Sequence, residues 1–354
     1  MTTETTTHPS NTSSTSVATG LIVLCPGQGA QAVGMGKMWC EKSQNAKAVF
    51  DLADGIVGNR LGEKLSTLCF EGPADVLNHT DVSQPALYTC AVACWRGLME
   101  RSDFERTPLV AAMGLSLGEY TALHIAGAID FESGLELVLL RGRAMQDAAE
   151  QQQGGMVALI GADEAQALEV CDKARVDDVL VCANFNAPGQ IVISGHKSAC
   201  DRAVDVATEM KLRATPLTVA GAFHSPLMQP AADRLSDALA QTTFRIPKCT
   251  VLANVDVEAH PGSTKGPIMG RAATDPAQLS RDLLARQLTS SVRWSDSCMR
   301  LASVVNRPRE QDNPSPAEHI DWHELAPGKT LMGLMRRINR DVKVMTHDEP
   351  ESPN

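Results

Sequence analysis

Residues 110–128 read VAAMGLSLGEYTALHIAGA and contain a Gly-x-Ser-x-Gly sequence that runs from Gly114 to Gly118. The apolar residues before it predict a strand and those after it predict a helix, so Ser116 lies on the turn between them. A tight strand-to-helix turn lifts a serine hydroxyl out of the sheet, and flanking glycines let neighbouring backbone approach closely. The unpaired N–H groups and the dipole of the helix start favour negative charge beside that serine. The stretch therefore predicts a nucleophile elbow centred on Ser116.

Apolar runs and helical periodicity on both sides of the elbow are typical of an α/β fold. Residues 21–25 (LIVLC) and 109–113 (LVAAM) are short and continuously apolar, which predicts buried parallel strands. Further expected elements are amphipathic helices between 35 and 98, a helix at about 133–151, strands at 250–255 and near 319–323, and a last helix at 331–338. We therefore predict a hydrolase-like large α/β subdomain, formed by residues 20–152 and 220–344, with a short parallel sheet surrounded by helices.

Residues 153–219 have a different rhythm of short alternating units. Their order is β-α-β-β-α-β, which is the pattern of a ferredoxin-like unit. Asp163 is a suitable N-cap for the first helix, and the stretch Asn186-Ala187-Pro188-Gly189 predicts a turn. The expected strands are 156–161, 179–185, 190–195 and 214–219, and the expected helices are 163–174 and 198–210. We predict that residues 153–219 form a small ferredoxin-like subdomain inserted into the large one.

The composition indicates a substantial core and argues against nucleic-acid and membrane partners. Of the 354 residues 43% are hydrophobic, and the formal net charge is −10, whereas nonspecific nucleic-acid binding depends on a cationic surface. No apolar run approaches the roughly 20 residues that a membrane helix needs. The ten cysteines occur singly, without metal-ligand spacing, as is typical of reduced thiols. We therefore predict a cytoplasmic protein without a bound metal.

Both ends of the chain and one internal stretch have the composition of unfolded segments. Residues 1–19 are rich in Thr and Ser and contain no Lys or Arg, so they lack the features of a secretory or organellar leader. Residues 345–354 are polar and contain proline. We predict disordered tails at 1–19 and 345–354, and an exposed loop at about 306–317.

A serine hydroxyl needs a base before it can act as a nucleophile, and His224 is the best candidate. It lies in GAFHSPLM, between a predicted strand and a helix that begins with proline, where loops display catalytic groups. His319 and His323 have the i, i+4 spacing that lets two helical histidines share a metal, but no third ligand accompanies them. A structural role for His224 remains the alternative.

The loop CPGQGAQ after the first strand admits two interpretations. It contains Gly-x-Gly-x-x-Ala, a degenerate dinucleotide fingerprint. However, Pro26 enters the turn, no second strand with an acidic end follows, and Ser116 would have no role in an oxidoreductase. The other interpretation is that Gln28 donates an amide N–H to an oxyanion, while the glycines allow close approach.

Eight motifs together give the chain a resemblance to a known family. In order they are CPGQGAQ, TDVSQPAL, GLSLGEYTAL, RGRAMQ, NFNAPGQIVISG, GAFHSPLM, LLARQL with VRW, and APGKTLMGLMRRI. This series resembles malonyl-CoA:acyl carrier protein transacylases, the acyltransferases of fatty acid and polyketide synthesis, and covers about residues 21–340. The inserted ferredoxin-like unit also fits that family.

The resemblance implies a role for each matching residue. Ser116 would be the acylated nucleophile and His224 its general base and acid, while an N–H of Gln28 and the backbone N–H of Leu117 would form the oxyanion hole. Arg141 would bind the malonyl carboxylate, for which a planar fork of donors is well suited. The remaining expected positions are Gln287, whose backbone carbonyl would orient His224, Gln84 and Asn186 in the acyl pocket, and Phe223, which would leave little space for an α-methyl group. Turn or packing roles remain open for Gln84 and Asn186.

The implied reaction is malonyl transfer from malonyl-CoA to the phosphopantetheine thiol of acyl carrier protein, through malonyl-Ser116, for fatty acid biosynthesis. Coenzyme A thioester is then a substrate, and no cofactor is bound. One departure is visible, because the family usually has histidine where this chain has Leu115. Two other readings are a discrete polyketide acyltransferase and a serine hydrolase or thioesterase, which needs an acidic residue between Ser116 and the histidine. A non-catalytic docking module would require an inert serine.

An acidic enzyme that meets an acidic carrier protein needs a local basic surface. We predict that this patch draws on five arginines near the C-terminus of the chain, with a solvated helix face as the alternative. They are Arg281, Arg286, Arg336, Arg337 and Arg340.

Overall fold

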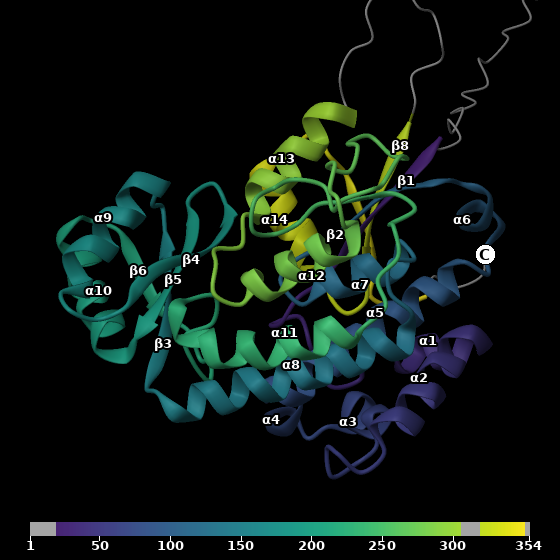
Figure 1. Cartoon of the computed structure of the whole chain (residues 1–354), viewed down its shortest axis with the longest axis horizontal. Coiled ribbons are helices and arrows are strands. Elements are labelled where there is room, and N and C mark those ends of the chain that lie inside the picture. Colours follow the sequence, from purple (N-terminus) through teal and green to yellow (C-terminus); the bar gives the residue numbers. More distant parts are fainter. Residues whose placement is uncertain (1–18, 306–318, 351–354) are drawn as a thin grey trace, which may run out of the picture.

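The computed structural model describes residues 19–305 and 319–350, which form two separate β-sheets (Figure 1). The five-stranded sheet has the order β7-β2-β1-β8-β9, and all of its strand pairs are parallel. Its strands are Gly20–Cys25 (β1), Leu109–Gly114 (β2), Thr250–Val251 (β7), Ile320–Leu325 (β8) and Val344–His347 (β9). We call this sheet and the helices packed on it the parallel region.

Helices cover both faces of the parallel sheet, which explains why β1 is apolar and buried along its whole length. Leu21 and Val23 face a core shared with α2, α5, α7 and α8, whereas Ile22 and Leu24 face α13 and α14. The helices of this region are α1 (Lys37–Lys42), α2 (Gln44–Val57), α3 (Leu65–Glu71), α4 (Ala74–Leu77), α5 (Thr80–Leu98), α6 (Ser102–Arg106), α7 (Gly118–Ile125), α8 (Phe131–Gln151), the 3-10 helix Pro226–Met228, α11 (Gln229–Gln241), α12 (Pro276–Gln287), α13 (Trp294–Val305) and α14 (Thr330–Ile338).

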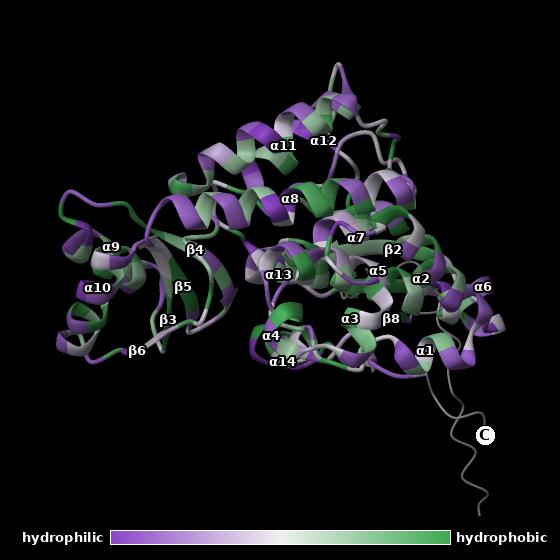
Figure 2. Ribbon diagram, turned by 90° about the horizontal axis from the view of Figure 1, so that it is seen from below, coloured by the Kyte–Doolittle hydropathy of each residue, from purple (hydrophilic) through white to green (hydrophobic). Residues whose placement is uncertain are grey.

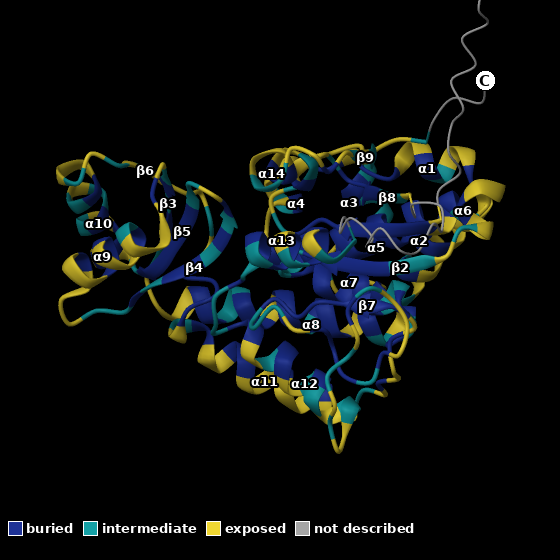
Figure 3. Cartoon of the chain, turned by 90° about the horizontal axis from the view of Figure 1, so that it is seen from above, coloured by how far each residue is buried: buried dark blue, intermediate teal, exposed yellow. Residues whose placement is uncertain are grey.

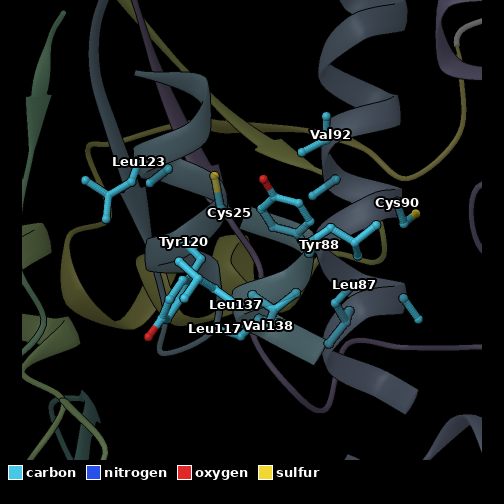
Figure 4. Close-up of a cluster of buried hydrophobic side chains, with 14 of the residues drawn as sticks. Cys25, Leu87, Tyr88, Cys90, Val92, Leu117, Tyr120, Leu123, Leu137 and Val138 are labelled. Carbon is cyan, nitrogen blue, oxygen red and sulfur yellow. The ribbon is translucent and has the colours of Figure 1, made fainter. Parts of the chain in front are cut away.

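Helix α5 runs through the middle of the parallel region and is buried on nearly all sides (Figure 3). Figure 4 shows part of the core that surrounds it, where Leu87 of α5, Tyr120 of α7 and Val138 of α8 meet. Helix α8 lies beside α5 and exposes its outer side. Together these packed helices give α7 and α8, which carry predicted site residues, a fixed position relative to the sheet.

The second sheet is antiparallel, has four strands, and lies to one side of the parallel region (Figure 1). Its order is β4-β5-β3-β6, and α9 and α10 pack on one face over a separate hydrophobic core. The elements are β3 (Gly154–Ile160), α9 (Glu164–Arg175), β4 (Leu180–Ala187), β5 (Gln190–His196), α10 (Lys197–Glu209) and β6 (Arg213–Pro216). The predicted β-α-β-β-α-β order is therefore observed. We call residues 154–216 the antiparallel region.

Two predicted strands are shorter than expected. The strand expected at 250–255 pairs with β2 only at Thr250 and Val251, because the chain then turns so that Asn254 bonds to the elbow. The strand expected at 214–219 ends at Pro216. The expected strand near 319–323 is β8, at Ile320–Leu325.

The predicted tail at 345–354 is wrong for its first residues. Residues 345–347 belong to β9, which pairs with β8 from Trp322 to Leu325 and so gains backbone hydrogen bonds that the local composition does not indicate. The predictions for 1–18, for 306–317 and for 351–354 lie outside the described residues. No helix in the described ranges is long and apolar enough to cross a bilayer.

Candidate active site

The turn at Ser116 is the tight elbow that the sequence predicts. Ser116 has φ 53°, in the left-handed region, between the end of β2 and the start of α7. A Cβ on Gly114 would lie 1.8 Å from the backbone carbon of Gly118, and one on Gly118 would lie 2.2 Å from the carbonyl oxygen of Cys25. Both positions therefore require glycine, because backbone atoms occupy the space of a side chain.

His224 lies against the serine in the orientation of a base. Its Nε2 is 2.7 Å from Ser116 Oγ, and its Nδ1 is 2.8 Å from the backbone carbonyl of Gln287. Because that carbonyl can only accept, the proton resides on Nδ1 and leaves the Nε2 lone pair toward the hydroxyl. Burial, with the Arg141 charge nearby, lowers the pKa of His224 from 6.5 to about 4, against the opposing effect of the bond to Gln287. The imidazole is therefore neutral at pH 7.

Arg141 places a buried guanidinium beside the same hydroxyl. Its side chain is 1% exposed, and burial lowers its pKa. Nη2 donates to Ser116 Oγ (3.0 Å) and to Gln287 Oε1 (3.0 Å), and Nη1 donates to Gln84 Oε1 (2.6 Å). Within the described residues it forms no ion pair with a carboxylate, and its buried Nε has no acceptor. The charge of Glu119 and the ring of Tyr120 stabilise this cation only in part, since burial still lowers its pKa. A buried cation without a directly bound carboxylate is costly, so this geometry is suited to an anionic ligand.

The two groups predicted as an oxyanion hole flank the serine. Leu117 precedes the first residue of α7, and Gln28 lies in the loop after β1. Neither backbone N–H donates to an acceptor among the described residues. The Gln28 side chain bonds instead to Thr80 Oγ1 (3.4 Å). Gln28 thus shares a pocket with Ser116, Leu117 follows Ser116 in the chain, and each has a backbone N–H without an acceptor among the described residues.

A pocket of about 820 Å³ opens over Ser116 and His224. Gln28 lies at its edge, and Phe223 and Asn186 form parts of its wall. The side-chain oxygen of Asn186 is buried there without a donor. Neither Gln84 nor Arg141 is among the residues that line the pocket. Gln84 is fully buried in α5, where it accepts from Arg141 and donates through Nε2 to the sulfur of Met145 (3.3 Å), a pocket-lining residue.

Sequence reasoning missed a layer of polar residues behind the elbow. Asn254 accepts the backbone N–H of Ser116 with its side-chain oxygen (2.6 Å), and the buried carboxylate of Glu119 accepts from His260 Nε2 (2.8 Å). Glu119 belongs to the quoted elbow stretch, where an acidic residue at the start of a helix is also typical of an exposed first turn. No local pattern marks Asn254 or His260.

Three other predictions concern groups near or outside this site. The imidazole of His224 contacts no Asp or Glu among the described residues, so a triad of the hydrolase type is not formed there. The described part of the chain has no cluster of three His, Cys, Asp or Glu suited to a metal. His319 and His323 do not lie on a helix, and four residues of extended chain separate them by about 13 Å.

The five arginines do not form one patch. Arg281 and Arg286 lie on α12, whereas Arg336 and Arg337 lie on α14, and Figures 2 and 3 show these helices on opposite sides of the parallel region. Arg281 also bonds to the carbonyl of Thr242 and stacks over an aromatic ring. The prediction of a single basic surface from both helices is therefore wrong, because residues close in sequence to the C-terminus are separated by the sheet.

Comparison with known proteins shows the family of this chain. The sequence model of the acyl transferase domain family matches residues 22–307 of this chain. The malonyl CoA-acyl carrier protein transacylase of Salmonella typhimurium is 38% identical over 326 residues, which is 92% of this chain and 94% of that protein. This chain belongs to that acyltransferase family. The residues brought together around Ser116 come from seven of the eight motifs that carried the resemblance.

Solved structures of family members extend over nearly the whole chain. The malonyl-CoA:acyl carrier protein transacylase of Xanthomonas oryzae pv. oryzae has a TM-score of 0.79 and 36% identity, over 95% of this chain and 96% of that one. The complex PlMCAT:AntF, a type II PKS acyl-carrier protein with its malonyl-transacylase, has a TM-score of 0.79 and 32% identity, over 94% of this chain and 96% of that one. An α/β architecture with a parallel and a small antiparallel sheet is thus shared.

Proposed function

We propose that this acyltransferase transfers malonyl groups from malonyl-CoA to the phosphopantetheine thiol of acyl carrier protein, and that Ser116, His224 and Arg141 carry the reaction. The single observation that carries this proposal is the buried guanidinium without a carboxylate partner beside a serine hydroxyl that already faces a neutral imidazole. The proposed partners are those that the names of the relatives state.

The first half of the cycle forms malonyl-Ser116. Ser116 Oγ attacks the thioester carbonyl carbon while its proton passes to His224 Nε2, 2.7 Å away. The N–H groups of Gln28 and Leu117 would stabilise the negative charge that develops on the carbonyl oxygen. The C–S bond then breaks, and His224 returns the proton to the sulfur of coenzyme A.

The second half reverses these steps with another thiol. His224 takes the proton of the phosphopantetheine thiol, the sulfur attacks the ester carbon, and the C–O bond breaks as the proton returns to Ser116. Gln287 orients the imidazole throughout, through the bond from Nδ1 to its carbonyl. This scheme needs no bound cofactor, because side chains and backbone N–H groups supply every proton and charge.

Arg141 selects a substrate that carries its own carboxylate. The malonyl carboxylate would neutralise the buried charge and use the Nε that has no acceptor. An acetyl group offers nothing for these donors, so it would leave the cation uncompensated. Phe223, on the pocket wall beside His224, is proposed to restrict an α-methyl group, which is worth about 1 to 3 kcal/mol in selectivity.

The test is the intact mass of the protein after brief exposure to malonyl-CoA. We expect a gain of one malonyl group, retained until a carrier-protein thiol is added and absent in Ser116→Ala. A hydrolase would release malonate to water without accumulating the acyl-enzyme. A wild-type protein that gains no mass would contradict the proposal, as would a Ser116→Ala variant that still gains it.

Several finer assignments are proposals on the same basis. The β3-α9-β4-β5-α10-β6 order supports an inserted ferredoxin-like subdomain at 153–219, within a hydrolase-like subdomain at 20–152 and 220–344. Ten free thiols support a reducing, cytoplasmic location.

We assign the malonyl groups to fatty acid biosynthesis. The second candidate, polyketide synthesis, is favoured by the likeness to PlMCAT:AntF, and purified carrier proteins of the two pathways would distinguish them by relative kcat/KM.

A further inference from the structure

A buried carboxylate behind the elbow takes no part in the mechanism above. Glu119, in the first turn of α7, is 1% exposed. Its Oε2 accepts from Gln287 Nε2 (2.7 Å) and from the backbone N–H of Asn254 (3.0 Å), and its Oε1 accepts from His260 Nε2 (2.8 Å). Three donors therefore converge on one carboxylate that has no contact with the pocket. Buried charges with this many partners fix the groups that contact them.

The contact with Gln287 helps to orient that side-chain amide, whose Nε2 donates both to Glu119 (2.7 Å) and to the backbone carbonyl of Ser116 (3.0 Å). Gln287 Oε1 accepts from Arg141, which can only donate, and Gln287 Nε2 donates to Glu119, which when ionised can only accept. In the opposite orientation donors would face donors on one side and acceptors would face acceptors on the other. The same residue offers its backbone carbonyl to His224 Nδ1. Glu119 thus holds the residue that aligns both the guanidinium and the imidazole.

The contact with Asn254 acts on the nucleophile itself. The Asn254 side chain accepts the N–H of Ser116 (2.6 Å) and donates to the carbonyl of Gly114 (2.8 Å), so it clasps both sides of the turn. Ser116 has φ 53°, a conformation that costs free energy in a residue with a Cβ. By accepting the backbone N–H of Asn254, Glu119 holds the residue that forms these two hydrogen bonds in place.

We propose that Glu119 is a positioning residue for malonyl transfer, which aligns Arg141 and His224 through Gln287 and supports the Ser116 turn through Asn254. This inference rests on the proposed function, since it assumes that Arg141 binds the malonyl carboxylate. It predicts that a change at Glu119 affects the two substrates, malonyl-CoA and acetyl-CoA, to different extents. Loss of the Glu119 oxygens leaves Gln287 Nε2 with only the carbonyl of Ser116 as acceptor and so loosens the amide beside Arg141. Malonyl loading then falls more than acetyl loading does.

The experiment compares the rates at which malonyl-CoA and acetyl-CoA acylate Ser116, followed by rapid quench and intact mass. In Glu119→Ala we expect the malonyl-to-acetyl rate ratio to fall by about tenfold or more, since a charged buried hydrogen-bond partner is lost.

In Glu119→Gln the amide oxygen can accept from Gln287 and Asn254. Its NH2 can donate to His260 Nε2 once the imidazole proton moves to Nδ1, beside Ser280 Oγ (3.3 Å). We expect this variant to keep the ratio within about threefold of wild type.

Each outcome decides the inference. Equal losses for the two substrates in Glu119→Ala would mean that Glu119 contributes only to stability, and a Glu119→Gln variant as impaired as Glu119→Ala would rule out positioning through hydrogen bonds. If Glu119→Ala does not fold, Glu119→Asp provides the test, because the shorter side chain withdraws its oxygens from Gln287 and should lower the ratio. Ser280→Ala removes only the contact between Ser280 Oγ and His260 Nδ1, and it should leave the malonyl-to-acetyl rate ratio unchanged. Failure of wild-type protein to load malonyl would instead contradict the proposed function.

Discussion

The parallel and antiparallel regions contribute different things to one pocket. Every group to which we assign a chemical role lies in the parallel region, where the elements between β1 and α12 hold Ser116, Arg141 and His224 within hydrogen-bond distance of one another or of Gln287. The antiparallel region contributes only wall residues, among them Met156 and Asn186. The antiparallel region has its own core beneath α9 and α10, but its wall residue Met156 packs in the core of the parallel region. Because these wall residues form no hydrogen bond to the reacting groups, substitutions there should affect other kinetic constants than substitutions of Ser116, Arg141 or His224.

The largest effect expected in the parallel region comes from Arg141→Ala. Without the guanidinium, we expect malonyl loading to fall by about a hundredfold to a thousandfold, because a buried ion pair with the substrate carboxylate is lost. Acetyl loading should fall much less, since it loses only the contact to Ser116 Oγ. Acylation rates with the two thioesters measure both effects.

Arg143→Ala is the matched control for this substitution. Arg143 lies two residues away on α8, is 56% exposed, and pairs with Asp81 and Asp147 at the surface. Exposed pairs of this kind contribute little, so both acylation rates should remain at wild-type values. Equal losses of malonyl and acetyl loading in Arg141→Ala would show that the arginine does not select the carboxylate.

The next largest effect concerns stability. The titration of His224 makes the free energy of unfolding depend on pH. Its pKa is about 4 in the folded protein and 6.5 without the fold, so between these values the unfolded chain binds a proton that the native protein excludes. The free energy of unfolding therefore rises with pH across this window, by up to about 3 kcal/mol from this group. The contribution is complete above pH 6.5 and is lost as the pH falls toward 4.

Denaturant unfolding of wild type and His224→Gln between pH 4.5 and 7 isolates this contribution. The difference between their free energies of unfolding should grow with pH, because only the wild type has the imidazole. A difference that stays constant over the window would show that His224 titrates normally. The acylation rate of the wild type should keep its value at pH 7 down to about pH 5, since the base remains neutral.

A pair of glycine substitutions contrasts the backbone of the two regions. A Cβ at Gly118 would lie 2.2 Å from the carbonyl oxygen of Cys25, and neither backbone can move without disturbing β1 or the elbow. We expect Gly118→Ala to lower the free energy of unfolding by about 2 kcal/mol. At Gly155, in β3, the nearest atom is Cδ of Lys197 at 3.6 Å, which is ordinary contact. Gly155→Ala should change stability by no more than about 0.5 kcal/mol. Equal destabilisation of the two variants in denaturant titrations would contradict the contrast.

The elbow and most of the elements were predictable because their signals are local. A strand, a glycine-flanked serine and a helix follow one another within residues 110–128, and the alternation of short units over 153–219 needs only its own periodicity. The roles of Arg141, His224 and Gln287 came from the series of motifs. Nothing in their spacing indicates that residues up to 171 positions apart in the chain meet at Ser116, whose backbone carbonyl accepts from Gln287 Nε2.

The features that sequence reasoning missed depend on tertiary contacts. β9 forms because β8 offers a free edge, although it has only four residues and leads into a polar tail. β7 ends early because Asn254 leaves the sheet to bond Ser116, and Glu119 and His260 are recognisable as a pair only once the chain has folded. The arginines of α12 and α14 illustrate the reverse error, since nearness in sequence was taken for nearness on the surface.

The smallest effect is expected from the antiparallel region, with Asn186→Ala. Asn186 lies on the pocket wall with its side-chain oxygen buried and without a donor, and it contacts neither Ser116 nor His224. A ligand group that donates to this oxygen would be bound equally in the ground state and the transition state. Its loss should raise KM for malonyl-CoA by about threefold to tenfold and leave kcat unchanged. Steady-state rates at saturating carrier protein measure both constants. A fall in kcat comparable to that of Arg141→Ala would show that the antiparallel region also aligns reacting atoms, and the division between the two regions would then fail.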